Sequence, residues 1–506
     1  MKHIAQKVML DWKAMAAVSF TILLILNLDC LANPPYWDDI FGIHNQAIWL
    51  SRHKFDLIQL FSPTEKYILG GSNVYLGFMP YLYGILYSIF APQTVHILGH
   101  LFNIGCAALA FTLFYLIMKK FTSPGVSLLW CVAAVAQPVM AGAIASLGQE
   151  YLLAAVGGLA IYCLLEKRLW QALTWLIVAY FIKMTALVLA LAFLVWIIAD
   201  WILFRKDSKL IHYRKWVAAM AATVCGMAVI YSIWDSRNLT ADSPQSFNLK
   251  ATVEMIQFQA YALLPVFVLM LLVVLTIGMV AAIVYYRKIL LHSGQRNMKQ
   301  DTQILLLIFI AGFACAYFIY SAPLPRYTAF VIFPMCAFLA ISLPGRISIA
   351  GALVFIALGL ANINGTFFPK LPPMVSRSGE FLERSREYVS DIREQQVFCA
   401  ALETEFRHAA IVAYWPLVQI LTIPEMGYVT KPFENVYAAG RVPKYAPVRK
   451  FISVSAMPPQ TMYVYCANTA TMFDILPAKG DKIIWNSEKY PGCLMIYMKN
   501  PQKLRN

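Results

Sequence analysis

Residues 14–32 read AMAAVSFTILLILNLDCLA, and residues 33–39 that follow read NPPYWDD. The first segment has the length of about 20 apolar residues that a helix needs to cross a bilayer. Three lysines precede it, and a proline pair follows it where a signal peptide would have a small-residue cleavage site. We therefore expect a retained first membrane helix, followed at once by two adjacent carboxylates.

The composition of the whole chain supports a membrane location. Of its 506 residues 60% are hydrophobic and 13% are charged, and its mean hydropathy is +0.62. Soluble domains carry about 25% charged residues. Because this chain lacks the polar side chains to cover a globular surface, it is not expected to be a soluble enzyme, a disordered protein or a secreted disulfide scaffold. The net charge of +15 is typical of a membrane protein whose cytoplasmic loops carry Lys and Arg, so it requires no nucleic-acid partner.

Further apolar stretches follow the first helix, and the positions of the charges indicate which of them cross. If the Gly-, Pro- and Tyr-rich stretch 75–91 lies along the outer face, 17 of the 41 basic residues are cytoplasmic and seven lie in short outer loops. If it crosses, the basic clusters fall outside. We therefore predict a polytopic α-helical protein with about eleven spans and a cytoplasmic N-terminus, with a twelfth ordinary span as the alternative. The remaining stretches lie at about 95–118, 124–145, 150–165, 169–183, 184–204, 216–234, 260–286, 304–322, 326–343 and 347–363.

The end of the chain has a different character. Residues 364–506 contain 17 Lys and Arg, 12 Asp and Glu and no long apolar run. We therefore predict a transmembrane domain over 1–363, with a first outer loop at about 32–94, and a small extracytoplasmic α/β domain over 364–506. A helix is expected within 376–406, and short strands are expected at 410–420, 451–455, 462–466, 482–485 and 494–498. A disulfide between Cys466 and Cys493 is our expectation for an outside location, with Cys399 left over.

The few ionisable residues near the outer face are candidate site residues, because such groups are costly beside hydrocarbon. Asp38 and Asp39 follow the first helix. One of them can act as a general base, and one can cap a helix running from Ile40 to Ser51. His44 and His53 come next, but no compact metal-ligand motif surrounds them, so interfacial histidines are favoured over a metal site.

Two further outer positions carry charge. Glu150 stands alone at a turn and is either a second active-site acid or an acid favoured by the helix dipole. Arg326 and Tyr327 lie at the start of an apolar helix, where a guanidinium and a helix N-terminus suit a phosphate oxyanion. Lys183, between two apolar segments, is a similar candidate. Both basic residues could instead extend to the membrane surface.

The order of these features resembles the GT-C superfamily of membrane glycosyltransferases, and within it the protein O-mannosyltransferase and lipid A aminoarabinose-transferase branch. The resemblance covers about residues 14–345, followed by a folded outer domain. The motifs that carry it are Tyr36-Trp37-Asp38-Asp39, a loop over 40–91 with Met79-Pro80-Tyr81-Leu82-Tyr83, Lys119-Lys120, Pro138 through Glu150, Ile182-Lys183-Met184-Thr185, and Arg326-Tyr327 with Pro334.

The resemblance implies an inverting enzyme that moves a sugar from a polyprenyl-phosphate donor to a hydroxyl on a glycan, glycolipid or protein acceptor. It assigns the catalytic base to Asp39 or Asp38, with Glu150 as a second catalytic acid. It assigns the donor phosphate to Arg326 and Tyr327, aided by Lys183. The oligosaccharyltransferase branch uses a metal held by a DxD pair, which residues 148–150 lack. No metal and no other cofactor is therefore expected.

The expected location is a bacterial inner membrane, with the C-terminal domain in the periplasm. A lipid or solute transporter or flippase is the rival from another class, although the sequence shows no internal repeat of the kind common in transporters. An O-antigen ligase or polymerase is less favoured, because those enzymes have their large outer loop between late helices. The sequence identifies neither the sugar nor the acceptor.

Overall fold

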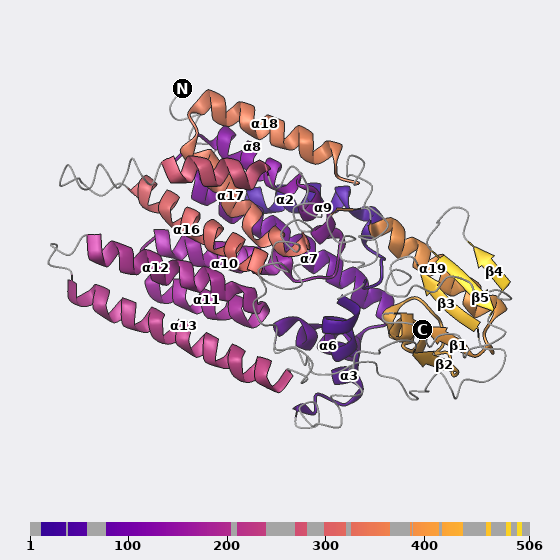
Figure 1. The fold of residues 1–506 in the computed structure, drawn as a ribbon. Coiled ribbons are helices and arrows are strands. Elements are labelled where there is room, and N and C mark those ends of the chain that lie inside the picture. The colour runs from indigo at the N-terminus through magenta and orange to yellow at the C-terminus, as the bar shows by residue number, and fades with distance from the viewer. Residues whose placement is uncertain are drawn as a thin grey trace.

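The computed structural model describes residues 12–36, 39–57, 77–203, 210–238, 269–280, 298–319, 325–364, 385–386, 388–413, 417–438, 462–466, 482–486 and 493–497. Long helices lie side by side and form a bundle, and one end of this bundle carries short helices and a β-sheet (Figure 1). The helices of the bundle are α2 (Trp12–Leu26), α7 (Pro92–Lys119), α8 (Pro124–Val135), α9 (Pro138–Ala145), α10 (Glu150–Leu165), α11 (Leu169–Ile182), α12 (Leu187–Leu203), α13 (Leu210–Asn238), α16 (Met298–Ile319), α17 (Ala329–Ser342) and α18 (Gly345–Ala361).

The described part of the chain is mainly helical, as predicted, and some of its helices are long and apolar enough to cross a membrane. By length and composition these are α7 and Met298–Tyr317 of α16, and the bent pair of α8 and α9 is a third if it counts as one span. Shorter apolar helices of 10–17 residues occupy the other stretches. The count of about eleven spans therefore remains a prediction.

The bend between α8 and α9 has a local cause. Helix α8 is capped at its start by Ser123, whose side chain accepts a hydrogen bond from the Val126 amide. The bend lies at the other end of this helix. Pro138 has no amide hydrogen and cannot continue the helical hydrogen bonds, but its fixed φ suits the first position of a new helix. The chain therefore turns by 68° between α8 and α9, and α9 leads to the turn before Glu150.

The first outer loop forms short helices at the end of the bundle (Figure 1). A π-helical turn, η2 (Asp39–His44), runs directly into α3 (Asn45–Arg52), where we expected one regular helix from Ile40 to Ser51. Stretch 75–91 forms α6 (Phe78–Ile89), which has only 12 residues and packs on α3. A helix of 12 residues is about 18 Å long, which is well short of the hydrocarbon thickness of about 30 Å.

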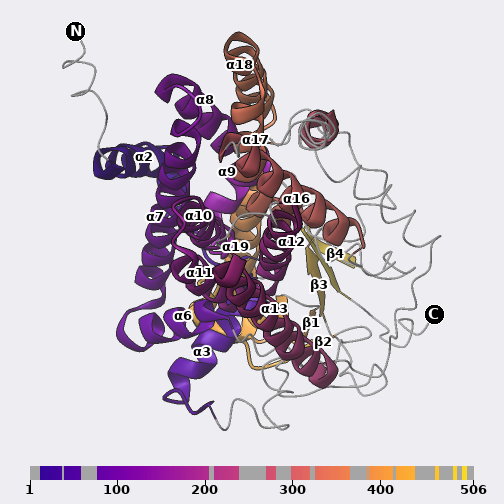
Figure 2. The same ribbon diagram turned by 90° about the vertical axis from the view of Figure 1, so that its left-hand side faces the viewer.

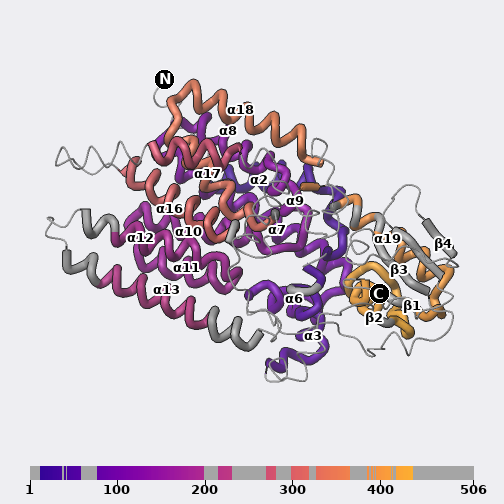
Figure 3. The backbone as a smooth tube through the Cα atoms, viewed as in Figure 1, coloured from indigo at the N-terminus to yellow at the C-terminus, as the bar shows by residue number. Residues whose placement is uncertain are grey.

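The tail, residues 364–506, contributes helices and strands at the same end. They are α19 (Tyr388–Glu405), β1 (Ile411–Ala413), α20 (Leu417–Thr422), β2 (Val436–Ala438), β3 (Met462–Cys466), β4 (Lys482–Asn486) and β5 (Cys493–Tyr497). The strand order is β2-β1-β3-β5-β4. Strand β1 runs parallel to β2 and β3, whereas β5 runs antiparallel to β3 and β4. The course of the backbone can be followed in Figure 3.

The strand expected at 410–420 is wrong beyond Ala413. Residues 417–422 form α20, and Leu417 through Leu421 are all buried. A short run that is buried on every side has no periodicity that distinguishes a helix from a strand. The strand expected at 451–455 lies outside the described residues. Cys466 and Cys493 are register partners across β3 and β5, which leaves their disulfide a prediction with suitable backbone placement.

Apolar packing joins the bundle helices. Phe333 of α17 stacks on Phe114 of α7 with ring centroids 5.1 Å apart. Trp130 of α8 is buried and donates to Ser348 of α18 at 2.8 Å. In the end-on view of Figure 2, α2 lies at the edge of the bundle beside α7.

Gly359 allows α18 to approach the bend between α8 and α9. A Cβ at Gly359 would overlap the backbone carbonyl of Ala136. A Cβ at Gly351 of the same helix would make ordinary contacts with Trp130, at 3.5 Å, and with Leu343, at 3.7 Å. We expect Gly359→Ala to destabilise the folded protein by about 1–3 kcal/mol and Gly351→Ala to have little effect. Thermal unfolding of the two variants in detergent measures this difference, and equal unfolding temperatures would contradict the close packing.

Candidate active site

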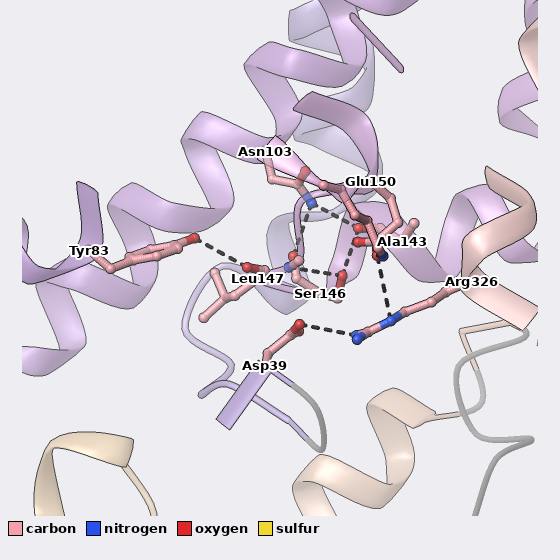
Figure 4. Close-up of polar contacts among 10 residues, drawn as sticks. Asp39, Tyr83, Asn103, Ala143, Ser146, Leu147, Glu150 and Arg326 are labelled. Carbon is pink, nitrogen blue, oxygen red and sulfur yellow. Dashed lines mark hydrogen bonds and ion pairs between the residues drawn. The ribbon is translucent and has the colours of Figure 1, made fainter. Parts of the chain in front are cut away.

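Four ionisable side chains from four separate segments meet at the end of the bundle that carries the sheet. Asp39 opens η2, Glu150 opens α10, Lys183 lies between α11 and the turn η3 (Met184–Ala186), and Arg326 lies in the turn η4 (Pro325–Thr328) before α17. Figure 4 shows that Arg326 points between the two carboxylates. We call these residues the ion cluster.

The contacts within the ion cluster are short. Arg326 Nη1 donates to Asp39 Oδ1 at 3.1 Å, and Arg326 Nε lies 3.5 Å from Glu150 Oε1. Lys183 Nζ donates to the same Glu150 oxygen at 2.8 Å. Glu150 thus pairs with both cations, and Arg326 bridges both carboxylates.

Burial makes these ion pairs strong constraints. The side chains of Asp39, Glu150, Arg326 and Lys183 are 2%, 3%, 9% and 10% exposed. Unpaired charges are very costly in such surroundings. Two carboxylates against two cations give the ion cluster no net charge, so each member depends on its partners to remain ionised.

Tyr327 covers one side of the ion cluster. Lys183 Nζ lies 3.9 Å from the centre of the Tyr327 ring, a distance at which a cation–π interaction is favourable. The guanidinium carbon of Arg326 is 5.8 Å from the same ring. The Tyr327 ring therefore lies near both cations of the ion cluster and closest to Lys183.

A network of backbone contacts shapes the turn before Glu150. Asn103 of α7 donates to the carbonyls of Ala143 and Ser146 at 2.8 and 3.0 Å, and Tyr83 donates to the carbonyl of Leu147 at 3.4 Å. These groups appear together in Figure 4. A side chain at Gly148 would overlap Glu150 Oε2. The turn is therefore built so that the Glu150 carboxylate reaches the two cations.

The structure brings together most of the predicted site residues. Asp39, Glu150, Lys183, Arg326 and Tyr327 lie in one group, whereas Asp38 lies outside the described residues. The basic side chains do not extend to a surface; they are buried and paired. Reasoning from sequence missed Asn103 and Tyr83 as supports. A polar residue such as Asn103 within an apolar stretch was the available signal.

The two histidines considered for a metal have other contacts. His53 stacks on Trp49 with ring centroids 4.1 Å apart. His44 Nδ1 and the Tyr87 hydroxyl are 2.8 Å apart in a hydrogen bond. No group of three or more His, Cys, Asp or Glu in the described ranges has the geometry to hold a metal ion.

Comparison with protein-family models, with curated protein sequences and with solved structures finds no match for this chain. Inferences about function therefore depend on the geometry of the site and on the sequence resemblance.

The ion cluster predicts a specific pattern of stability. Glu150→Gln would leave two buried cations without their shared carboxylate and is expected to destabilise the fold by about 3–5 kcal/mol. Adding Lys183→Met removes one of those cations, so the double variant should recover part of the loss. Denaturant or thermal unfolding of the single and double variants measures the coupling. Additive effects would contradict the pairing.

Proposed function

We propose that the protein is an inverting membrane glycosyltransferase that uses a polyprenyl-phosphate sugar and a hydroxyl acceptor. The single observation that carries this proposal is the buried ion cluster. Arg326 contacts both the candidate base Asp39 and Glu150, and Glu150 holds Lys183 as a second candidate phosphate-binding cation. Its position at the end of an apolar helical bundle suits a donor whose lipid is in the membrane and whose sugar is at the surface.

Arg326 and Lys183 are the proposed phosphate ligands. The leaving group of such a donor is a phosphate anion, which needs fixed positive charge nearby. The guanidinium can bind two phosphate oxygens, and an ammonium adds a point charge. Glu150 contacts both cations, and we assign it the role of fixing their positions. This role replaces that of a second proton-transferring acid.

Asp39 is the proposed general base. The acceptor hydroxyl oxygen attacks the anomeric carbon, its proton passes to the Asp39 carboxylate, and the bond between the anomeric carbon and the phosphate oxygen breaks. The products are the glycosylated acceptor and the polyprenyl phosphate anion, with inversion at the anomeric carbon. Asp38, which follows the same helix in sequence, is the alternative base.

The Asp39–Arg326 contact suggests an order of events. In the structure, Arg326 Nη1 lies 3.1 Å from the Asp39 carboxylate. A donor phosphate that binds Arg326 would replace this carboxylate and leave it available to the acceptor hydroxyl. The base would therefore become available only when a donor is present, which would limit loss of the activated sugar to water.

The proposed site faces the outer side of the membrane, where the acceptor is present. The tail contacts the segment just before Asp39, through the hydrogen bond from Tyr428 to the Pro35 carbonyl. The ion cluster therefore lies near the end of the bundle that carries the tail, and we assign this end to the outer face of a bacterial inner membrane. The acceptor is a glycan, glycolipid or protein that presents a hydroxyl there. A lipid or solute transporter is the competing function, because buried charges also mark transport pathways.

Turnover is tested with purified protein and a panel of polyprenyl-phosphate sugars, with release of polyprenyl phosphate as the readout. We expect Asp39→Asn to lower the rate by about 10²-fold or more, because general-base catalysis contributes on that scale. Asp38→Asn is measured in parallel to distinguish the two carboxylates. Undiminished turnover in both variants would remove the base assignment. No turnover with any donor, together with solute movement in liposomes, would favour the transporter.

We expect Asp39→Asn to bind the donor more tightly than the wild type, although it lowers turnover. Asp39→Asn removes the anion that competes with phosphate for Arg326, so we expect the donor Kd to fall several-fold although turnover is lost. Equilibrium binding of the donor measures it. The matched control is Glu166→Gln at the other end of α10, where Glu166 pairs with Lys120. A weaker donor affinity in Asp39→Asn would contradict the competition.

A further inference from the structure

The tail contacts the segment that precedes Asp39. The Tyr428 hydroxyl donates to the Pro35 carbonyl at 2.9 Å in a buried hydrogen bond. Burial, with Cys399 and the Asp39 carboxylate nearby, holds the pKa of the Tyr428 hydroxyl well above its ordinary value, so the hydroxyl keeps the proton that it donates. Tyr428 therefore fixes the backbone four residues before the proposed base.

The tail also reaches the residue that ends the Asp39 turn. The His96 ring lies directly against Gly427, where an added Cβ would come within 2.8 Å of its Cε1. His96 Nε2 is 3.2 Å from the Tyr87 hydroxyl, and that hydroxyl is 2.8 Å from His44 Nδ1. One packing contact and two hydrogen bonds thus connect the tail to His44, the last residue of η2.

The Tyr87 hydroxyl lies between two histidine rings and has one proton to donate, so it donates to one ring nitrogen and accepts from the other. Burial, together with His96 and His100, holds the pKa of His44 well below its ordinary value, so this ring is neutral. Tyr87 links His96 to the last residue of η2 in either donor order.

The backbone between Glu425 and Tyr428 is shaped for these contacts. Gly427 has φ +83°, which favours glycine, and a Cβ there would meet His96 Cε1 at 2.8 Å. The Glu425 side chain binds Arg52 of α3 through two oxygens, at 2.5 and 2.6 Å from Nη2. Ile40 and Ile48 pack in the same apolar cluster as Met426 and Tyr428.

We propose that residues 425–428 of the tail form a positioning element that holds the Asp39–His44 turn at both ends. Tyr428 acts on the segment before the turn, and Gly427 acts on its last residue through the packed His96 ring and Tyr87. The tail is then part of the site, because its contacts on both sides of the Asp39–His44 turn set the orientation of the Asp39 side chain. This inference rests on the proposed function for its catalytic consequence and on the contacts alone for its structural consequence.

The structural arm uses hydrogen exchange of the backbone amides in residues 33–44 of the full-length protein. Losing one buried hydrogen bond should accelerate this exchange by about five-fold in Tyr428→Phe and in Tyr87→Phe. The matched control is Tyr180→Phe, which removes an equally buried hydrogen bond, from the Tyr180 hydroxyl to the Met227 carbonyl at 2.7 Å. The control should leave exchange in residues 33–44 unchanged. Exchange that is unchanged in both test variants, or accelerated equally in the control, would overturn the proposal.

The catalytic arm separates positioning from general stability. With the donor that supports turnover, we expect Tyr428→Phe and Tyr87→Phe to lower kcat by about ten-fold while the donor Kd stays within two-fold, because Arg326 and Lys183 are untouched. Unchanged kcat with accelerated exchange would overturn the catalytic consequence. If the wild type turns over no donor but exchange responds as predicted, the proposed function fails and the positioning element stands.

Discussion

The arrangement of the site depends on one constraint, which is that two carboxylates and two cations buried in an apolar bundle must neutralise one another. Arg326 bridges Asp39 and Glu150, and Lys183 completes the group. Four segments distant in sequence are thereby fixed at one end of the bundle. Because a buried unpaired charge is very costly, the turn before Glu150 and the π-helical turn at Asp39 must hold these carboxylates within reach of Arg326.

The same constraint links structure to chemistry. The ion cluster is stable because its charges are paired, and Arg326 and Lys183 are also the cations that we propose to bind a phosphate anion. Anion binding would exchange one partner of Arg326 for another without leaving the guanidinium unpaired. The proposed reaction therefore requires a change of ion-pair partner at Arg326, while Glu150 keeps its contact with Lys183. The Asp39 carboxylate loses its cation in this exchange, and the resulting rise in its pKa favours uptake of the acceptor proton. The tail supports this arrangement from outside, through its contacts on both sides of Asp39.

Sequence reasoning identified the members of the ion cluster because ionisable residues are few in this chain and their positions near helix ends are conspicuous. It could not pair them, since Lys183 and Glu150 are 33 residues apart and Arg326 and Asp39 are 287 apart. Periodicity located the apolar helices well. It failed at residues 417–420, where a buried helix was taken for part of a strand, and at η2, because a π-helical turn has no simple sequence pattern. The contacts of Tyr428 and Glu425 depend on tertiary packing and had no signal in the sequence.

The central claim is that the ion cluster binds the phosphate of a lipid-linked substrate. The most direct test is equilibrium binding of undecaprenyl phosphate to the wild type and to Arg326→Gln in detergent, with Arg346→Gln as a control, since Arg346 is exposed near the start of α18. We expect Arg326→Gln to weaken binding by about ten-fold or more, because the lost hydrogen bonds are charge-assisted, and Arg346→Gln to leave it unchanged. Equal affinity of the wild type and Arg326→Gln would contradict it.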